Sequence, residues 1–244
     1  AGGVRAQFSD PVNIALGQRG LEAFERFASR PGGEIDLHQN GYLFLLDNAD
    51  DVRVFEESVR LQNSLGVPSR IVSVAEACAL SPLVSPEGLL AAAYSPRDGH
   101  CTPEAVVQGY ASAARRFGAR IVTGCEVTGI VVSDGEITAV RTSNEDILTS
   151  VVVCAAGAWA GSVGDMAGVD LPVRPLRRQI RVTEPLPWLP AGVPMTIDFG
   201  STFYFHPEGR GLLFGMSDPS EPFGFDVGVS DAWLERLAPV VTRR

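Results

Sequence analysis

Residues 151–159 read VVVCAAGAW, an apolar run that passes into small residues and a glycine. The first three residues are β-branched, so the pattern predicts a fully buried strand. Gly157 would let another molecule approach the backbone, and Trp159 would add a flat surface at the strand's carboxyl end, where open α/β sheets bind ligands. By periodicity alone, a plain core strand with a tight exit is the favoured interpretation.

The composition is typical of a globular protein, with 45% hydrophobic and 20% charged residues in 244. This length suffices for one large domain or two modest ones. No apolar run approaches the ~20 residues of a membrane-spanning helix. The net charge of −9 and the lack of a basic stripe with interleaved aromatics argue against nucleic-acid binding. Four cysteines without CxxC spacing favour free thiols in a reducing cytoplasm.

Helical spacing and capping residues predict the helices of the chain. We expect them from Pro11 to Gly32, over 50–65, after the capping-box residue Ser73, from Thr102 to Phe117, and from Ser230 to about Leu237.

Runs of β-branched and aromatic residues between turn signals predict the strands. We expect them over 42–46, 89–94, 119–123, 127–132, 136–142, 147–154, 202–206 and 212–216. Ser133-Asp134-Gly135 is a hairpin signal between two of them. The mixture predicts a mixed α/β (α+β) fold with two discontinuous domains.

Several common catalytic motifs are absent. The chain contains no GxGxxG, Walker loop, HExxH or GxSxG. Its three histidines, His38, His100 and His206, are scattered along the sequence without metal-ligand spacing, so no metal site is expected.

Four stretches together carry a family resemblance: AGGVR at 1–5, DGHCTP at 98–103, GCEV at 124–127 and AAGAW at 155–159. In order and spacing they resemble the FAD-dependent amine and amino-acid oxidoreductases of the D-amino-acid oxidase superfamily, on the branch of sarcosine oxidase and glycine oxidase. The resemblance spans essentially the whole chain. A full-length member also has an N-terminal GxGxxG turn and a further C-terminal stretch, so we expect this chain to be an internal fragment.

The resemblance implies FAD as the cofactor and a division of the chain into two domains. Residues 1–38 and 100–167 would form part of an FAD-binding, Rossmann-like domain. Residues 39–99 and 168–244 would form a substrate-binding domain with a mostly antiparallel sheet.

The resemblance also implies roles for individual residues. The backbone of Ala1, Gly2 and Gly3 would lie along the flavin, Val127 would contact the adenine, and Ala155, Ala156, Gly157 and Trp159 would lie near the pyrophosphate. As a structural alternative, the glycines could belong to a flexible cut end, and Val127 and Trp159 could simply pack.

Three further residues match positions of the substrate pocket. Arg5 would grip a substrate carboxylate, as a planar guanidinium can do with two hydrogen bonds. Tyr204 would line the cavity, and Ser217 falls where some relatives carry a pocket histidine. A solvated arginine and a core tyrosine are the structural alternatives.

The implied reaction is oxidation of an amine or amino acid, in which hydride leaves the α carbon for the flavin and an imine remains. Two alternatives stay open: a non-catalytic ligand-binding or subunit-contact module, and an FAD-dependent hydroxy-acid dehydrogenase. The expected partner is a small-molecule substrate, with homo- or hetero-oligomers left open, and the expected location is the cytoplasm.

Overall fold

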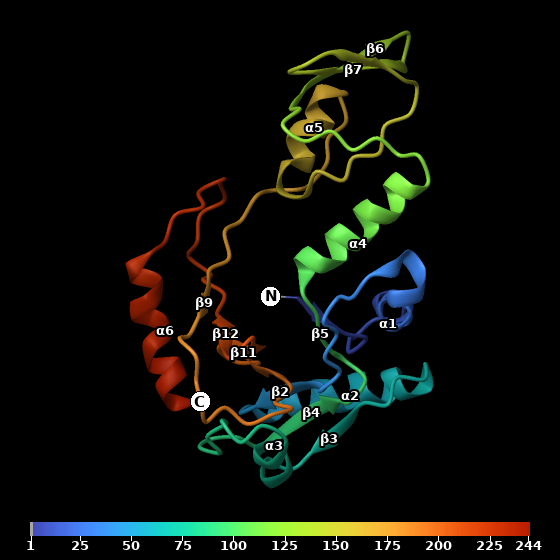
Figure 1. The fold of residues 1–244 in the computed structure, drawn as a ribbon. Coiled ribbons are helices and arrows are strands. Elements are labelled where there is room, and N and C mark those ends of the chain that lie inside the picture. The colour runs from blue at the N-terminus through green and yellow to red at the C-terminus, as the bar shows by residue number, and fades with distance from the viewer. Residues whose placement is uncertain (1) are drawn as a thin grey trace. The chain divides into compact units, whose positions relative to one another are not determined.

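The computed structural model describes residues 2–244 and divides the chain into two compact units (Figure 1). Unit 1 comprises Ala1–Ala119, Arg178–Ser217 and Ser230–Arg244, and unit 2 comprises Arg120–Arg177 and Asp218–Val229. The assignment of FAD-binding and substrate-binding domains stays a prediction. No helix in the described part of the chain has both the length and the apolar character needed to cross a bilayer.

Unit 1 is built on a seven-stranded sheet with the order β3-β4-β2-β10-β11-β12-β9 (Figure 1). Its strands are β2 (Tyr42–Leu46), β3 (Arg70–Val72), β4 (Ala91–Ser95), β9 (Ile180–Val182), β10 (Met195–Asp198), β11 (Tyr204–Glu208) and β12 (Gly211–Gly215). Only β2 and β10 pair in parallel, and every other pairing in this sheet is antiparallel. The expected mixed fold with a mostly antiparallel sheet is therefore confirmed.

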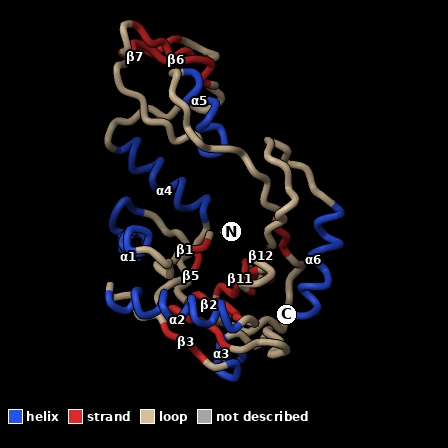
Figure 2. The backbone as a smooth tube through the Cα atoms, turned by 180° about the vertical axis from the view of Figure 1, so that it is seen from behind, coloured by secondary structure: helices blue, strands red, loops and turns tan. Residues whose placement is uncertain are grey.

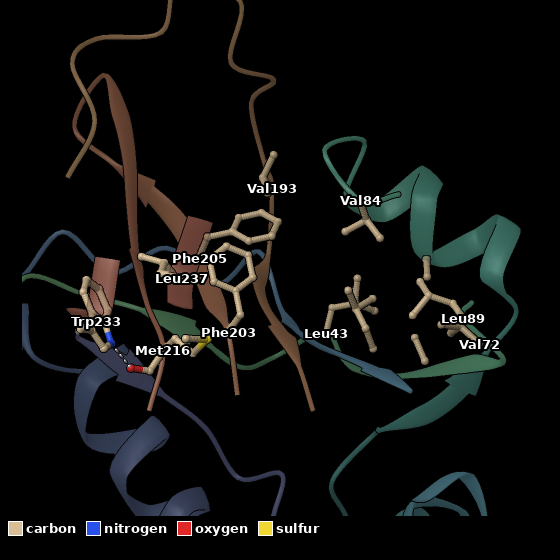
Figure 3. Close-up of a cluster of buried hydrophobic side chains, with 13 residues drawn as sticks. Leu43, Val72, Val84, Leu89, Val193, Phe203, Phe205, Met216, Trp233 and Leu237 are labelled. Atoms are coloured by element: carbon tan, nitrogen blue, oxygen red, sulfur yellow. Dashed lines mark hydrogen bonds between the residues drawn. The ribbon is translucent and has the colours of Figure 1, made fainter. Parts of the chain in front are cut away.

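The two faces of this sheet carry different side chains, because successive strand residues point to opposite sides. Leu43 and Leu45 belong to the larger core cluster, together with Phe203 and Phe205 (Figure 3). Two helices contribute to that cluster, α3 (Val74–Leu80) and α6 (Asp231–Arg243). The indole nitrogen of Trp233 in α6 donates to the Met216 carbonyl at 2.9 Å (Figure 3). Burying the indole with its donor satisfied fixes α6 on this face.

The opposite face is aromatic. Tyr42 and Phe44 form a second cluster with Ala93 and Met195, against which Tyr204 packs. Phe55 of α2 (Ala49–Ser64) joins it, with ring centroids 5.3 Å from Phe44.

Most helix starts agree with the sequence. The helix α1 (Pro11–Glu25) is capped by the Asp10 side chain, which accepts from the Asn13 N–H, and Ser73 caps α3. The helix α4 (Pro103–Arg116) begins as predicted, although the Thr102 hydroxyl makes no capping bond. The backbone N–H of Thr102 instead donates to the Ile35 carbonyl.

Two helix ends differ from prediction. The first helix stops at Glu25, and a separate π turn, η1 (Ala28–Gly32), follows it. Pro31 in that turn has no N–H to continue a helix. The last helix, α6, runs on to Arg243 instead of ending near Leu237. Buried contacts on both sides of Pro239, at Leu237 and Arg244, hold this extension.

Unit 2 contains a three-stranded antiparallel sheet of β6 (Val127–Ser133), β7 (Glu136–Thr142) and β8 (Asp146–Leu148). Asp134 and Gly135 both have positive φ, 52° and 82°, as the predicted tight hairpin turn requires. The short turn η2 (Gly157–Trp159) and the helix α5 (Ala160–Met166) complete this unit.

Two predicted strands are wrong. Residues 151–156 form no strand, and Val151 and Val153 are 74% and 85% exposed rather than buried. Residues 119–123 also form no strand. A β-branched run expresses a propensity, but a strand needs a neighbouring strand to bond with. Neither segment has one among the described residues.

A second antiparallel pair in unit 1 joins β1 (Gly3–Val4) to β5 (Gly99–His100), which lie side by side in Figure 2. This pair, hereafter the β1–β5 ribbon, leads directly into Arg5 of the candidate site.

A buried ion-pair cluster ties the end of α6 to the sheet. The Arg244 guanidinium donates to Asp198 and Asp47, each at 2.8 Å, and to the Glu87 carbonyl at 2.7 Å. The Arg244 and Asp198 side chains are 1% and 0% exposed. Removing one member would therefore leave an uncompensated buried charge.

We expect Arg244→Ala to lower the free energy of unfolding by about 3–5 kcal/mol, because the buried Asp198 carboxylate loses its buried guanidinium partner and keeps only the half-exposed Arg243. Arg243→Ala is the matched control: this half-exposed neighbour lies 3.5 Å from Asp198, and its loss should cost at most about 1 kcal/mol. Urea unfolding of both variants measures these changes. Equal losses of unfolding free energy in the two variants would contradict the role of Arg244 as the main partner of Asp198.

Candidate functional site

The β1–β5 ribbon fixes the first described residues of the chain. Gly3 pairs with His100, Val4 pairs with Gly99, and the Cys101 N–H donates to the Gly2 carbonyl at 2.9 Å. A Cβ at Gly3 would lie 1.9 Å from the Tyr42 hydroxyl, and one at Gly2 would lie 2.1 Å from the Cys101 carbonyl. Only glycine permits this packing, so the protein's own contacts account for both glycines.

Arg5 follows this ribbon and lies among three aromatic rings. Its guanidinium carbon is 4.7 Å from the ring centroid of Phe8, 5.2 Å from that of Phe44 and 5.7 Å from that of Tyr42. Such cation–π contacts orient the group without using its N–H donors. Within residues 2–244 no carboxylate forms an ion pair with Arg5. The half-buried guanidinium can therefore receive an external anion.

Two tyrosines share the aromatic face with Arg5. Tyr204 is half-buried on β11, opposite Gly215, where a Cβ would lie 2.6 Å from its hydroxyl. Burial raises the pKa of Tyr42 to about 12, while the nearby Arg5 opposes the shift. Burial also raises the pKa of Tyr204. Both phenols therefore stay protonated at neutral pH and can donate hydrogen bonds.

An open pocket of about 320 Å³ lies beside these residues. Arg5, Phe8 and Tyr42 line it together with Gly3, and Leu16 and Gly17 of α1 complete part of its wall. Its volume lies at the lower end of the range for small-molecule sites.

Asp98 supports the same segment from below the surface. It is fully buried, and its Oδ1 accepts a hydrogen bond from the Ala6 N–H at 3.1 Å. Burial raises its pKa to about 6, against the lowering effects of the Ala6 bond and the nearby Arg5.

Sequence reasoning missed part of this arrangement. It gave no role to Tyr42, Phe44, Phe8 or Asp98. A signal was available only for Asp98, which belongs to the DGHCTP stretch that carried the family resemblance.

Ser217 lies in unit 1, as Arg5 and Tyr204 do, but its described hydrogen bond is made to neither of them. Its N–H donates to the Thr202 hydroxyl at 3.0 Å, two residues beyond the Tyr204–Gly215 pair. The pocket role of Ser217 stays a prediction.

Of the predicted cofactor residues, Gly2 and Gly3 belong to the β1–β5 ribbon of unit 1, and Ala1 lies outside the described residues. The remaining ones belong to unit 2. Val127 begins β6 and is half-buried. Gly157 has φ +55°, and a Cβ added there would meet no atom within 4 Å. Trp159 is 59% exposed and stacks on Phe225, with ring centroids 5.3 Å apart. Ala155 and Ala156 precede this turn, with Ala155 exposed.

The three histidines, although distant from one another in the sequence, lie close together in space. The His100 ring centroid lies 5.1 Å from that of His38 and 4.3 Å from that of His206. A β-bridge joins His38 to His100 and so brings these two residues together. Across the described chain, no three His, Cys, Asp or Glu side chains are grouped so as to hold a metal ion.

Comparison with known proteins identifies the family of this chain. Residues 1–244 match the family described as DAO, FAD dependent oxidoreductase, so the chain belongs to this family of flavin enzymes and the expected resemblance is confirmed. It is 28% identical to dimethylglycine dehydrogenase of Rattus norvegicus over 91% of this chain and 26% of that protein. It is 32% identical to sarcosine dehydrogenase of Mus musculus over 80% of this chain and 22% of that protein.

A solved structure agrees with this placement. L-proline dehydrogenase from P. horikoshii superposes with a TM-score of 0.92 at 29% identity, over 100% of this chain and 65% of that one. The chain thus spans about a quarter of the two mitochondrial dehydrogenases and just under two thirds of the solved chain.

FAD, the cofactor of the family, is compatible with the predicted residues. At Gly157 the space that a side chain would fill is open, and small residues precede it. Trp159 and Phe225 present an exposed stacked pair beside that turn. In unit 1, Gly3 stays exposed even though its Cβ position is blocked by Tyr42. Each of these backbones is open to a flat ligand.

The histidine cluster predicts a pH-dependent stability. Burial, together with His206 and His38, lowers the pKa of His100 from 6.5 to about 4, while Asp36 opposes the shift. Between these values the unfolded imidazole binds a proton that the folded one does not, so this group makes the free energy of unfolding fall as the pH drops from 6.5 to about 4. Asp98, whose pKa is raised, makes the free energy of unfolding rise as the pH drops. Every variant that keeps Asp98 shares this contribution, so it does not affect the comparison.

We therefore expect His100→Gln to lose less stability than the parent between about pH 7 and about pH 4.5 in urea unfolding. His38→Gln is the control and should retain most of the steeper fall, because His100 is still present and burial, the largest cause of its lowered pKa, is unchanged. Identical slopes for the parent and His100→Gln would contradict this assignment.

Proposed function

We propose that this chain is part of an FAD-dependent enzyme that oxidises an amine or amino acid at its C–N bond, with Arg5 as the carboxylate anchor. One observation carries the proposal. The Arg5 guanidinium is oriented by three aromatic rings, has no protein carboxylate paired with it in the described chain, and borders an open pocket.

Arg5, which lines the pocket, and Tyr204, which lies outside its lining, would both contribute to substrate binding. Arg5 would hold the substrate carboxylate through two parallel N–H donors. The hydroxyl of Tyr204 would donate a further hydrogen bond, and the rings around Arg5 would keep water from the bound carboxylate. Together these contacts would fix the orientation of the substrate's α carbon.

FAD, when bound, supplies the two-electron acceptor for the hydride that leaves the α carbon, and water then hydrolyses the resulting imine. The residues that would hold it are Ala1, Gly2, Gly3, Val127, Ala155, Ala156, Gly157 and Trp159. This chain's part in the reaction is thus to position the substrate beside the cofactor and to exclude solvent.

The names of the relatives support the amine class, because sarcosine, dimethylglycine and proline are all amino acids with a substituted nitrogen. A hydroxy acid could use the same carboxylate anchor. The substrate class is therefore tested directly.

We expect an amino acid such as sarcosine, dimethylglycine or proline to bleach the visible flavin band of the FAD-loaded protein under anaerobic conditions. Lactate and glycolate, which carry the carboxylate but no amine, should leave the band unchanged. Bleaching by the hydroxy acids alone would favour a hydroxy-acid dehydrogenase. A protein that retains no flavin would favour the non-catalytic module. Oxygen uptake compared with dye reduction then separates an oxidase from a dehydrogenase.

We expect Arg5→Ala to lower kcat/KM for the amino-acid substrate about 100-fold, equivalent to about 2.7 kcal/mol of lost binding. Arg5→Lys keeps the charge but loses the planar fork, so its loss should be smaller. Arg19→Ala, which removes an exposed arginine from the same region, is the control and should match the parent. Unchanged steady-state kinetics in Arg5→Ala would refute the role of Arg5 as anchor.

A further inference from the structure

Asp98 joins distant parts of unit 1 next to the Arg5 segment. Its side chain accepts from the Ala6 N–H, and its carbonyl accepts from the Gly41 N–H at 2.8 Å. Gly41 immediately precedes Tyr42, and Ala6 immediately follows Arg5. One buried residue thus links the backbone beside the arginine to the backbone beside a ring that contacts it.

Val4 and Ala6, on either side of Arg5, pack in a buried cluster with Ile14 and Leu21, and two contacts lie directly against the Arg5–Ala6 backbone. The strand before it, β1, has only two residues and pairs only with the two of β5. On the other side α1 touches it at Gly17, where a Cβ would lie 2.5 Å from the Arg5 carbonyl and 2.8 Å from the Ala6 Cα. The Arg5–Ala6 backbone is therefore held between Gly17 and Asp98.

The Asp98 carboxylate holds this backbone without neutralising the guanidinium. No ion pair joins Asp98 to Arg5 in the described chain. The Oδ2 atom of Asp98 is buried without a hydrogen-bond partner. A carboxylate placed to bond a backbone amide can set the position of an arginine while leaving its donors to a ligand.

We propose that Asp98 is a positioning residue for the carboxylate site, acting on Arg5 through the Ala6 N–H. This inference rests on the proposed function of Arg5 as carboxylate anchor. Because the effect runs through a hydrogen bond to the backbone, an acceptor oxygen at position 98 is the essential feature. The negative charge is not.

Two substitutions separate the acceptor from the charge. Asp98→Asn keeps an oxygen that can accept from Ala6, whereas Asp98→Ala removes it. In the FAD-loaded protein, Asp98→Ala should raise both the KM of the amino-acid substrate and the inhibition constant of acetate about tenfold, with kcat within about twofold of the parent. Asp98→Asn should stay within about threefold of the parent in all three.

Asp10→Asn is the matched control. Asp10 lies near Arg5 in sequence and caps α1, and asparagine caps a helix equally well. This variant removes one negative charge and should leave KM, kcat and the acetate constant unchanged.

Gly17→Ala tests the same backbone from the other side, and it decides the matter if Asp98→Ala does not fold. The new methyl group would press on the Arg5 carbonyl, so it should also raise KM and the acetate constant while kcat changes little. A fall in kcat with an unchanged acetate constant, or an Asp98→Asn variant as impaired as Asp98→Ala, would overturn the proposal.

Arg5→Ala distinguishes a failure of the proposed carboxylate anchor from a failure of the positioning role of Asp98. If Arg5→Ala binds acetate as the parent does, the proposed anchor itself is wrong. If Arg5→Ala loses acetate binding while Asp98→Ala and Gly17→Ala retain it, only the positioning role of Asp98 is wrong.

Discussion

The candidate site depends on the close packing of β1 against β5 and Tyr42. Gly2 and Gly3 bring their backbones so near to Cys101 and Tyr42 that no side chain fits. The residues that follow are thereby placed over the aromatic face of the sheet, where Arg5 contacts three rings. A methyl group on either glycine would move β1, and with it the guanidinium, because among the described residues no further strand pairs with this ribbon.

The seven-stranded sheet carries the main apolar core on one face and the candidate binding residues on the other. One face buries Leu43, Leu45, Phe203 and Phe205 under helices and belongs to the largest apolar cluster of the described chain. The other face carries Tyr42, whose ring contacts the half-buried Arg5, and Tyr204, which packs against the same aromatic cluster. Since neighbouring residues of one strand point to opposite faces, the same strands build the core and place the site. A shift of register by one residue would exchange the two sets.

The sequence predicted what depends on local chemistry. The Asp10 and Ser73 caps and the turn at Asp134-Gly135 lie where the residue types require them. It did not predict what depends on distant partners. The valines of residues 151–153 have the composition of a strand, yet no described strand pairs with them. The convergence of His38, His100 and His206 depends on pairings between segments far apart in the chain, which spacing alone does not encode.

The same limit applies to Arg5. From sequence, a lone arginine after a glycine pair could equally be solvated, but its environment is set by Phe8, Tyr42 and Phe44, two of which come from a strand nearly 40 residues away. Aromatic rings displace part of the water around a guanidinium and replace few of its hydrogen bonds. An arginine held in this way has lost hydration that an anion could replace. A carboxylate would therefore bind more strongly here than at an exposed arginine, where it must compete with water.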